Sequence, residues 1–89
     1  MQLTAELSFY PLAEDYIPPI KAFITELAGQ AGLQMVTNRM STQISGSFDD
    51  VTQAINQAMR ACMSGPGRAV LVVKYLNTAL PVLSAPDLD

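Results

Sequence analysis

The chain has 89 residues, of which 49% are apolar and 15% are charged, and its net charge is −3 with no histidine. This length is enough for one domain and too short for two. The five basic residues are spread along the chain without a cluster, which disfavours binding to nucleic acid or to an anionic membrane surface.

The high apolar content predicts self-association. A domain of this size buries only about 60–70% of the surface that its unfolded chain exposes. Some of the apolar side chains are therefore expected on the surface of a monomer, where a homo-oligomer would cover them.

The single cysteine and the missing leader indicate the compartment. Cys62 cannot form an internal disulfide, which favours a reducing environment. The sequence does not begin with a basic segment followed by an apolar one, and its apolar runs are far shorter than the roughly 20 residues of a membrane span. We expect a cytoplasmic protein without membrane insertion.

The first third of the sequence predicts a strand and then a helix. Apolar and polar residues alternate from Gln2 to Phe9, which is typical of a strand with one buried face, and Pro11 is expected to end it. A helix is predicted to begin near Ile17, because Pro18 and Pro19 are tolerated in a first turn, and to stop at Gly32. Its apolar stripe comprises Ile17, Ile20, Ile24, Leu27, Ala28 and Ala31.

The middle of the chain predicts a hairpin and a second helix. Leu33–Thr37 and Met40–Ser45 are expected to be strands joined by a tight turn at residues 38–39. Ser47 and Asp50 form a capping pattern that begins a helix, which residues 64–67 end. The apolar stripe of this helix comprises Phe48, Val51, Ile55, Ala58, Met59 and Cys62.

The last part of the chain predicts a strand and a tail. Ala69–Leu76 begins with an apolar run on both faces, as in a strand covered on both sides. Residues 77–89 contain two prolines and are expected to form a loosely attached tail.

This order of elements predicts an α+β fold, the ferredoxin-like βαββαβ plait, over residues 1–76. Its four-stranded antiparallel sheet would carry both helices on one face and leave the other face bare. The bare face is expected to present Gln2, Thr4, Glu6, Ser8 and Tyr10 from the first strand and Ser41, Gln43 and Ser45 from the third. Such a mixed polar and apolar surface suits a partner sheet, a small ligand, or both.

The sequence carries no signature of catalysis. Without histidine it lacks the commonest general base and metal ligand, and no glycine-rich phosphate loop follows a strand. Cys62 is expected to be a core thiol, and Asp49 and Asp50 to be first-turn charges of a helix. We expect no metal, no cofactor and no enzymatic activity.

Glu6 is unusual because acidic residues are depleted within strands. On an open sheet face it would simply be solvated. Under a second sheet it would need a cationic or hydrogen-bonding partner to remain ionised.

Two segments of the sequence carry a family resemblance. They are Ser8-Phe9-Tyr10-Pro11-Leu12 and Met40-Ser41-Thr42-Gln43-Ile44-Ser45-Gly46, the latter leading into Phe48-Asp49-Asp50-Val51. Both segments resemble the YkoF-like domains. The resemblance covers residues 3–76 and implies a ferredoxin-like fold that binds thiamine or its hydroxymethylpyrimidine moiety without turnover, in vitamin salvage or transport. The YkoF protein resembles two such domains in tandem, so a single domain implies a homodimer or a dimer of dimers.

The resemblance also implies a set of ligand-binding residues. They are Glu6, Ser8, Tyr10, Met40, Ser41, Thr42 and Gln43. Glu6 would pair with the thiamine cation or the amino group, the hydroxyl and amide groups would satisfy the pyrimidine nitrogens, and Tyr10 would stack on a ring. Thr42 shares its parity with Ile44, so it could instead lie beneath the helices.

Two other functions remain open. An oligomeric regulatory or interaction module with no small-molecule ligand would also use the apolar surface. A small enzyme acting in a dimer cavity is the weakest alternative, because histidine is missing.

Overall fold

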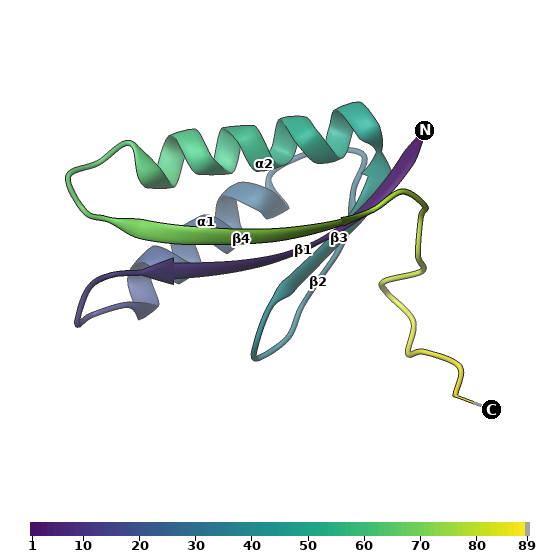
Figure 1. The fold of residues 1–89 in the computed structure, drawn as a ribbon, viewed down its shortest axis with the longest axis horizontal. Helices are drawn as coiled ribbons and strands as arrows, with labels where there is room; N and C mark the ends of the chain where they lie inside the picture. Colours follow the sequence, from purple (N-terminus) through teal and green to yellow (C-terminus); the bar gives the residue numbers. More distant parts are fainter. Residues whose placement is uncertain (89) are drawn as a thin grey trace.

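The computed structural model describes residues 1–88 and contains the six predicted elements in the predicted order (Figure 1). They are β1 (Gln2–Pro11), α1 (Ile17–Ala28), β2 (Gln34–Thr37), β3 (Thr42–Ser47), α2 (Phe48–Met63) and β4 (Ala69–Leu76). The strands form one antiparallel sheet in the order β2-β3-β1-β4, and both helices pack on one face of it. The predicted ferredoxin-like plait is confirmed.

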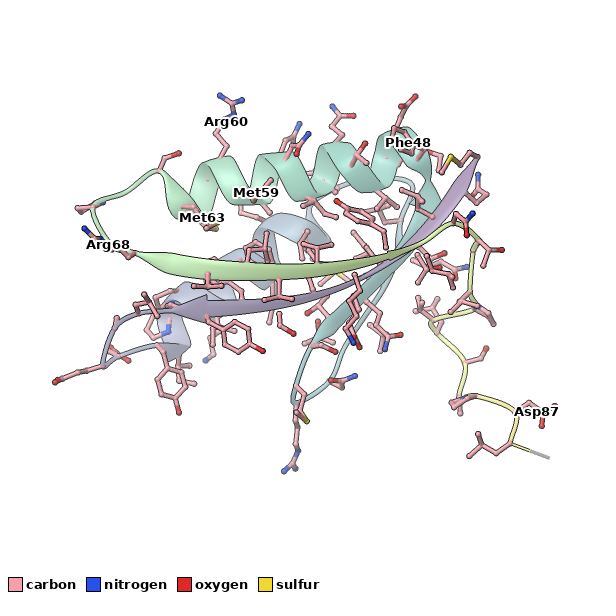
Figure 2. The ribbon with its side chains drawn as sticks, in the orientation of Figure 1. Phe48, Met59, Arg60, Met63, Arg68 and Asp87 are labelled. Carbon is pink, nitrogen blue, oxygen red and sulfur yellow. The ribbon has the colours of Figure 1, made fainter. Side chains whose placement is uncertain are left out.

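The core lies between the helices and the odd-numbered residues of β1, as the alternation predicts. Its fully buried members are Leu3, Ala5, Leu7, Phe23, Leu27, Ile44, Val51, Ala54, Ile55 and Ala58. In α2, Met59 faces the sheet whereas Arg60 points away from it (Figure 2). Ser47 caps this helix by accepting a hydrogen bond from the Asp50 main-chain N–H (3.1 Å), which confirms the predicted cap.

The buried face of α1 differs from the predicted stripe. Phe23 is buried and its ring stacks on that of Phe9, with centroids 4.5 Å apart, whereas Ile17 in the first turn is 47% exposed. An aromatic ring within the same helical face thus fills the space above the sheet.

Helix α1 ends at Ala28, so the predicted end at Gly32 is one turn too late. The N–H groups of Gly29 and Gln30 donate to Thr25 and Leu27 and close the last turn. Gly32 instead has a φ of 82°, a left-handed conformation that turns the chain into β2 and favours glycine.

The boundaries of three strands also differ from those predicted. β2 begins at Gln34 and not at Leu33. β1 continues to Pro11 because the nitrogen of Pro11 faces the side on which β3 has already ended, so no ladder bond is lost there. β3 begins at Thr42 and not at Met40, because residues 38–41 form a turn closed by a bond from the Asn38 N–H to the Ser41 carbonyl (2.9 Å).

β4 is covered on one face only. Leu71 and Val73 pack against the core, whereas Val70 and Val72 on the bare face are about half exposed, so the predicted cover on both sides is absent from this single chain. Within residues 1–88, neither helix is both long and apolar enough to cross a membrane.

The start of the tail is bonded to the sheet. The Thr4 hydroxyl donates to the Thr78 carbonyl and accepts from the Leu80 N–H, both at 2.8 Å. Val82 is buried. Residues 77–82 therefore cover one end of the bare face.

Candidate functional site

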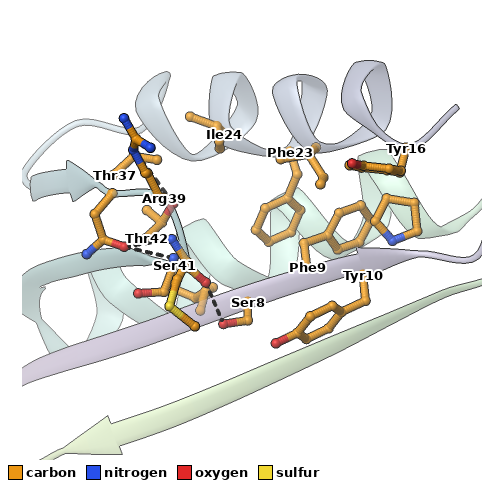
Figure 3. A pocket seen from close by; sticks show the side chains of 15 residues that line it. Ser8, Phe9, Tyr10, Tyr16, Phe23, Ile24, Thr37, Arg39, Ser41 and Thr42 are labelled. Atoms are coloured by element: carbon orange, nitrogen blue, oxygen red, sulfur yellow. Dashed lines mark hydrogen bonds between the residues drawn. The ribbon is translucent and has the colours of Figure 1, made fainter.

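A cavity of about 290 Å³ opens where β1 extends beyond the end of β3 (Figure 3). The last residue of β1 that pairs with β3 is Leu7, opposite Thr42, and residues 8–11 pair with β4 alone. α1 covers one side of the resulting notch, and the turn at residues 38–41 borders the other. The cavity thus arises from unequal strand lengths.

The cavity wall is mainly apolar. The stacked rings of Phe9 and Phe23 lie between the sheet and α1 (Figure 3). The other apolar or aromatic residues of the lining are Leu7, Tyr10, Pro11, Tyr16, Ile20, Ile24 and Met40. An apolar wall with a few polar groups is typical of small-molecule sites.

The polar groups of the cavity gather at its hairpin end. The hydroxyls of Thr37 and Thr42 lie 3.0 Å apart and share a hydrogen bond, and the Ser8 hydroxyl donates to the Met40 carbonyl (3.4 Å). Arg39 is the charged residue of the lining, which contains no carboxylate among the residues that the structure describes.

Asn38 shapes the turn that borders the cavity. Its side-chain oxygen accepts hydrogen bonds from the main-chain N–H groups of Met40 (3.0 Å) and Ser41 (2.9 Å). These bonds hold residues 39–41 away from the ladder of β1. The notch therefore stays open.

A second hollow lies on the bare sheet face, across the same turn. Glu6 lies within it, 3.0 Å from the Lys74 ammonium and 3.1 Å from the Ser41 hydroxyl, which donates to it. The Lys74 bond, the Ser41 bond and the Gln43 side chain hold the pKa of the Glu6 carboxyl below its ordinary value, although partial burial opposes them. Glu6 has the cationic and hydrogen-bonding partners that a covered carboxylate would need.

Six of the seven expected ligand residues border these two hollows. Ser8, Tyr10, Met40 and Ser41 border both of them. Thr42 lines only the helix-side cavity and is 5% exposed, which agrees with its shared parity with Ile44.

The two remaining residues belong to the bare face. Glu6 lines only the bare-face hollow. Gln43 lines neither hollow and lies opposite Glu6 in the β1–β3 ladder.

Sequence reasoning missed several residues of the two hollows. Phe23 lies beside the aliphatic stripe of α1 and is buried, and its spacing from Ile20 and Leu27 is the signal that identifies it. Lys74 lies directly opposite Glu6 in the β1–β4 ladder. Only the register of these two strands identifies Lys74 as the partner of Glu6, and the periodicity of the sequence does not reveal that register.

Cys62 has the surroundings of a structural thiol. It packs partly buried against the core, and burial together with the Glu26 carboxylate raises the pKa of the thiol. A thiol with a raised pKa is a poor nucleophile at neutral pH.

Comparisons with known proteins agree with this fold. A family model described as the YKOF-related family matches residues 2–73. No curated protein matches the sequence significantly.

Three solved structures illustrate the likeness. A hypothetical protein from Methanocaldococcus jannaschii is 24% identical with a TM-score of 0.75, over 86% of this chain and 80% of that one. A candidate thiamine biosynthesis/salvage protein from Thermotoga maritima is 16% identical with a TM-score of 0.72, over 97% and 90%. A domain of unknown function from Bacillus cereus is 23% identical with a TM-score of 0.67, over 89% and 78%. At these identities the likeness shows a shared fold.

Proposed function

The chain belongs to the YkoF-related family, and from this premise we propose that it binds thiamine or its hydroxymethylpyrimidine moiety without turnover, in vitamin salvage or transport. The observation that carries the proposal is the cavity beside β1, with its apolar wall and its hydroxyl groups at one end. The similar Thermotoga maritima protein, described as a candidate for thiamine biosynthesis or salvage, supports the same ligand class.

The size of the cavity favours one heteroaromatic ring. Its volume of about 290 Å³ is at the lower end of the range of roughly 300–1,000 Å³ typical of ligand pockets. A pyrimidine can contact the Phe9 and Phe23 side chains, and the Thr37 and Thr42 hydroxyls can hydrogen-bond to its substituents. We therefore assign the pyrimidine to the cavity.

On the basis of charge, we assign the thiazolium ring of thiamine to the other side of the turn. The described cavity lining carries Arg39 and no carboxylate, so it offers a cation no counter-ion. Glu6 lies in the neighbouring hollow, and Ser8, Tyr10, Met40 and Ser41 border both spaces. In this proposal Glu6 attracts the thiazolium cation, Gln43 helps to hold the Glu6 carboxylate, and Lys74 competes for it.

Calorimetric titration tests the proposal. We expect saturable binding of thiamine and of 4-amino-5-hydroxymethyl-2-methylpyrimidine, and about five- to tenfold weaker binding of both to Thr42→Val, which loses a hydroxyl of the cavity. Ser45→Ala is the matched control, since it removes an equally buried hydroxyl of β3 outside the cavity. If neither thiamine nor the pyrimidine binds at millimolar concentration, the function is refuted.

The exposed apolar residues of the bare face favour a second candidate, an interaction module without a ligand. Tyr10, Val70 and Val72 are each about half exposed there, and a second copy of the chain could cover them. In that case Glu6→Ala should leave the assembly intact, and neither thiamine nor the pyrimidine should raise the melting temperature. A ligand-dependent rise would favour the first function.

A further inference from the structure

The direction of the main-chain groups of β1 can be read from its pairing. The Leu12 N–H donates to the Arg68 carbonyl (2.9 Å), so the even-numbered residues of β1 exchange hydrogen bonds with β4. Main-chain groups of successive strand residues point to opposite sides. The N–H and C=O of Phe9 therefore point away from β4, toward the notch where β3 has ended.

Met40 would be the partner of Phe9 if the β1–β3 ladder continued beyond Leu7 and Thr42. Neither main-chain group of Met40 bonds to Phe9. The Met40 N–H donates to the Asn38 side chain (3.0 Å), and the Met40 C=O accepts from the Ser8 hydroxyl (3.4 Å). Within residues 1–88, the Phe9 N–H and C=O consequently have no hydrogen-bond partner on this side.

Unpaired main-chain groups in a half-buried strand residue are uncommon and costly. Phe9 lines the cavity, so a molecule bound there can supply the missing partners. Pro11 has no N–H, and the N–H groups of Ser8 and Tyr10 face β4. Along residues 8–11, the Phe9 N–H is thus the main-chain donor that faces the notch.

We infer that the main-chain N–H and C=O of Phe9 recognise the aminopyrimidine edge of the ligand, an inference that rests on the proposed function. A 4-aminopyrimidine presents a ring nitrogen that accepts a hydrogen bond beside an amino group that donates one. One strand residue offers the complementary pair, with its N–H donating to the ring nitrogen and its C=O accepting from the amino group. The ligand then takes the place that the next residue of β3 would occupy.

The main-chain pair of Phe9 selects one class of ligand. Flat heteroaromatic molecules with an adjacent acceptor and donor are selected, and the rings that lack the donor are rejected, because they would leave the Phe9 C=O unpaired. Because main-chain groups make this selection, the side chains in the sequence do not indicate which ligand is selected.

Amide hydrogen exchange of the ¹⁵N-labelled wild-type chain tests the inference without a substitution. On addition of 4-amino-5-hydroxymethyl-2-methylpyrimidine, exchange of the Phe9 amide should slow at least tenfold and its proton resonance should move downfield. The Leu7 and Tyr10 amides are internal controls, because they already bond to β3 and β4 and should keep their exchange rates.

A ligand analogue tests the acceptor half of the pair. The 4-methyl analogue keeps the shape of the amino compound but cannot donate, and it should bind about tenfold more weakly or worse. If the pyrimidine binds but leaves Phe9 exchange unchanged, or if the 4-methyl analogue binds equally well, the inference is wrong and the proposed function stands. If thiamine binds and the pyrimidine does not, the inference is wrong and the proposed function stands. If neither binds, both are wrong.

Discussion

Glu6 in β1 and Thr42 in β3 show how residues of two neighbouring strands acquire different surroundings. Both belong to the expected ligand set, yet Thr42 is buried beneath α1 and Glu6 lies on the bare face with Lys74. The alternation of side chains along strands separates them, since Leu7 pairs with Thr42 on one face and Glu6 with Gln43 on the other. A ligand that contacts both residues must pass around the turn at residues 38–41.

The Glu6–Lys74 pair predicts a pH-dependent contribution to stability. The folded-state pKa of Glu6 is lowered, first by Lys74 and then by Ser41, so its stabilisation is present above the ordinary carboxyl pKa and is lost as pH falls through the folded value. The Lys74 side chain is 77% exposed, so the loss in free energy of unfolding for Glu6→Gln should be below about 1 kcal/mol at neutral pH.

Urea denaturation at several pH values measures this contribution. The difference between wild type and Glu6→Gln should disappear in acid. Glu14→Gln, in the exposed segment before α1, controls for the loss of one negative charge. A difference that persists unchanged at acid pH would contradict the prediction.

Lys74 should also act as a competitor for a cationic ligand. Lys74→Met removes the ammonium group that lies 3.0 Å from Glu6 and leaves the carboxylate available. We expect thiamine to bind severalfold more tightly to this variant and the uncharged pyrimidine to bind as it does to wild type, both measured by calorimetry. Equal changes for the two ligands would show that Glu6 does not contact the thiazolium ring.

At the scale of elements, the site arises from strands and a helix that end at different positions. β1 extends beyond β3 to Pro11, and the Asn38 turn keeps the hairpin from following it. α1 covers one side of the cavity, where Phe23 stacks on Phe9. The first part of the tail, residues 77–82, lies at the opposite end of β1 and covers part of the bare face.

The attachment of the tail depends on one hydroxyl. Thr4→Val keeps the β-branched shape of the strand residue but removes the bonds to Thr78 and Leu80. We expect a loss of about 1–2 kcal/mol in free energy of unfolding and faster exchange of the Leu80 amide. Thr25→Val, whose hydroxyl bonds only within α1, should leave the Leu80 amide protected. Unchanged protection in Thr4→Val would contradict this account of the tail.

At the scale of the whole molecule, one sheet face is covered by helices and the other is largely open. Between Tyr10 and Lys74 the open face combines half-exposed apolar residues with the Glu6 ion pair. We propose that a second copy of the chain covers this face, since an open apolar patch in a small domain is commonly an association surface.

A charge placed on the open face should disrupt that assembly. Val72 is 46% exposed, so Val72→Lys should change the free energy of unfolding by no more than about 0.5 kcal/mol while placing an ammonium in the interface. Light scattering should then show a lower molar mass for Val72→Lys than for wild type. Gln57→Lys, on the exposed face of α2, should keep the wild-type mass. A wild type that is monomeric at every concentration would refute the assembly.

Local patterns determined the order of the elements, the Ser47 cap and the parity of Thr42, because each depends on residues close together in the chain. The plait followed from that order through the general rules by which strands and helices connect. Element ends such as Ala28 and Thr42 were placed less well, since they depend on turn bonds made by Gly29, Gln30 and Asn38.

Only the tertiary structure decided which side chains and main-chain groups share a space. The pairing of Glu6 with Lys74 and the unpaired main chain of Phe9 follow from the register of strands distant in sequence. The stacking of Phe23 on Phe9 follows from the packing of α1 on the sheet. Register is a long-range property, set by how the whole sheet packs under the helices, and no local pattern along the chain encodes it.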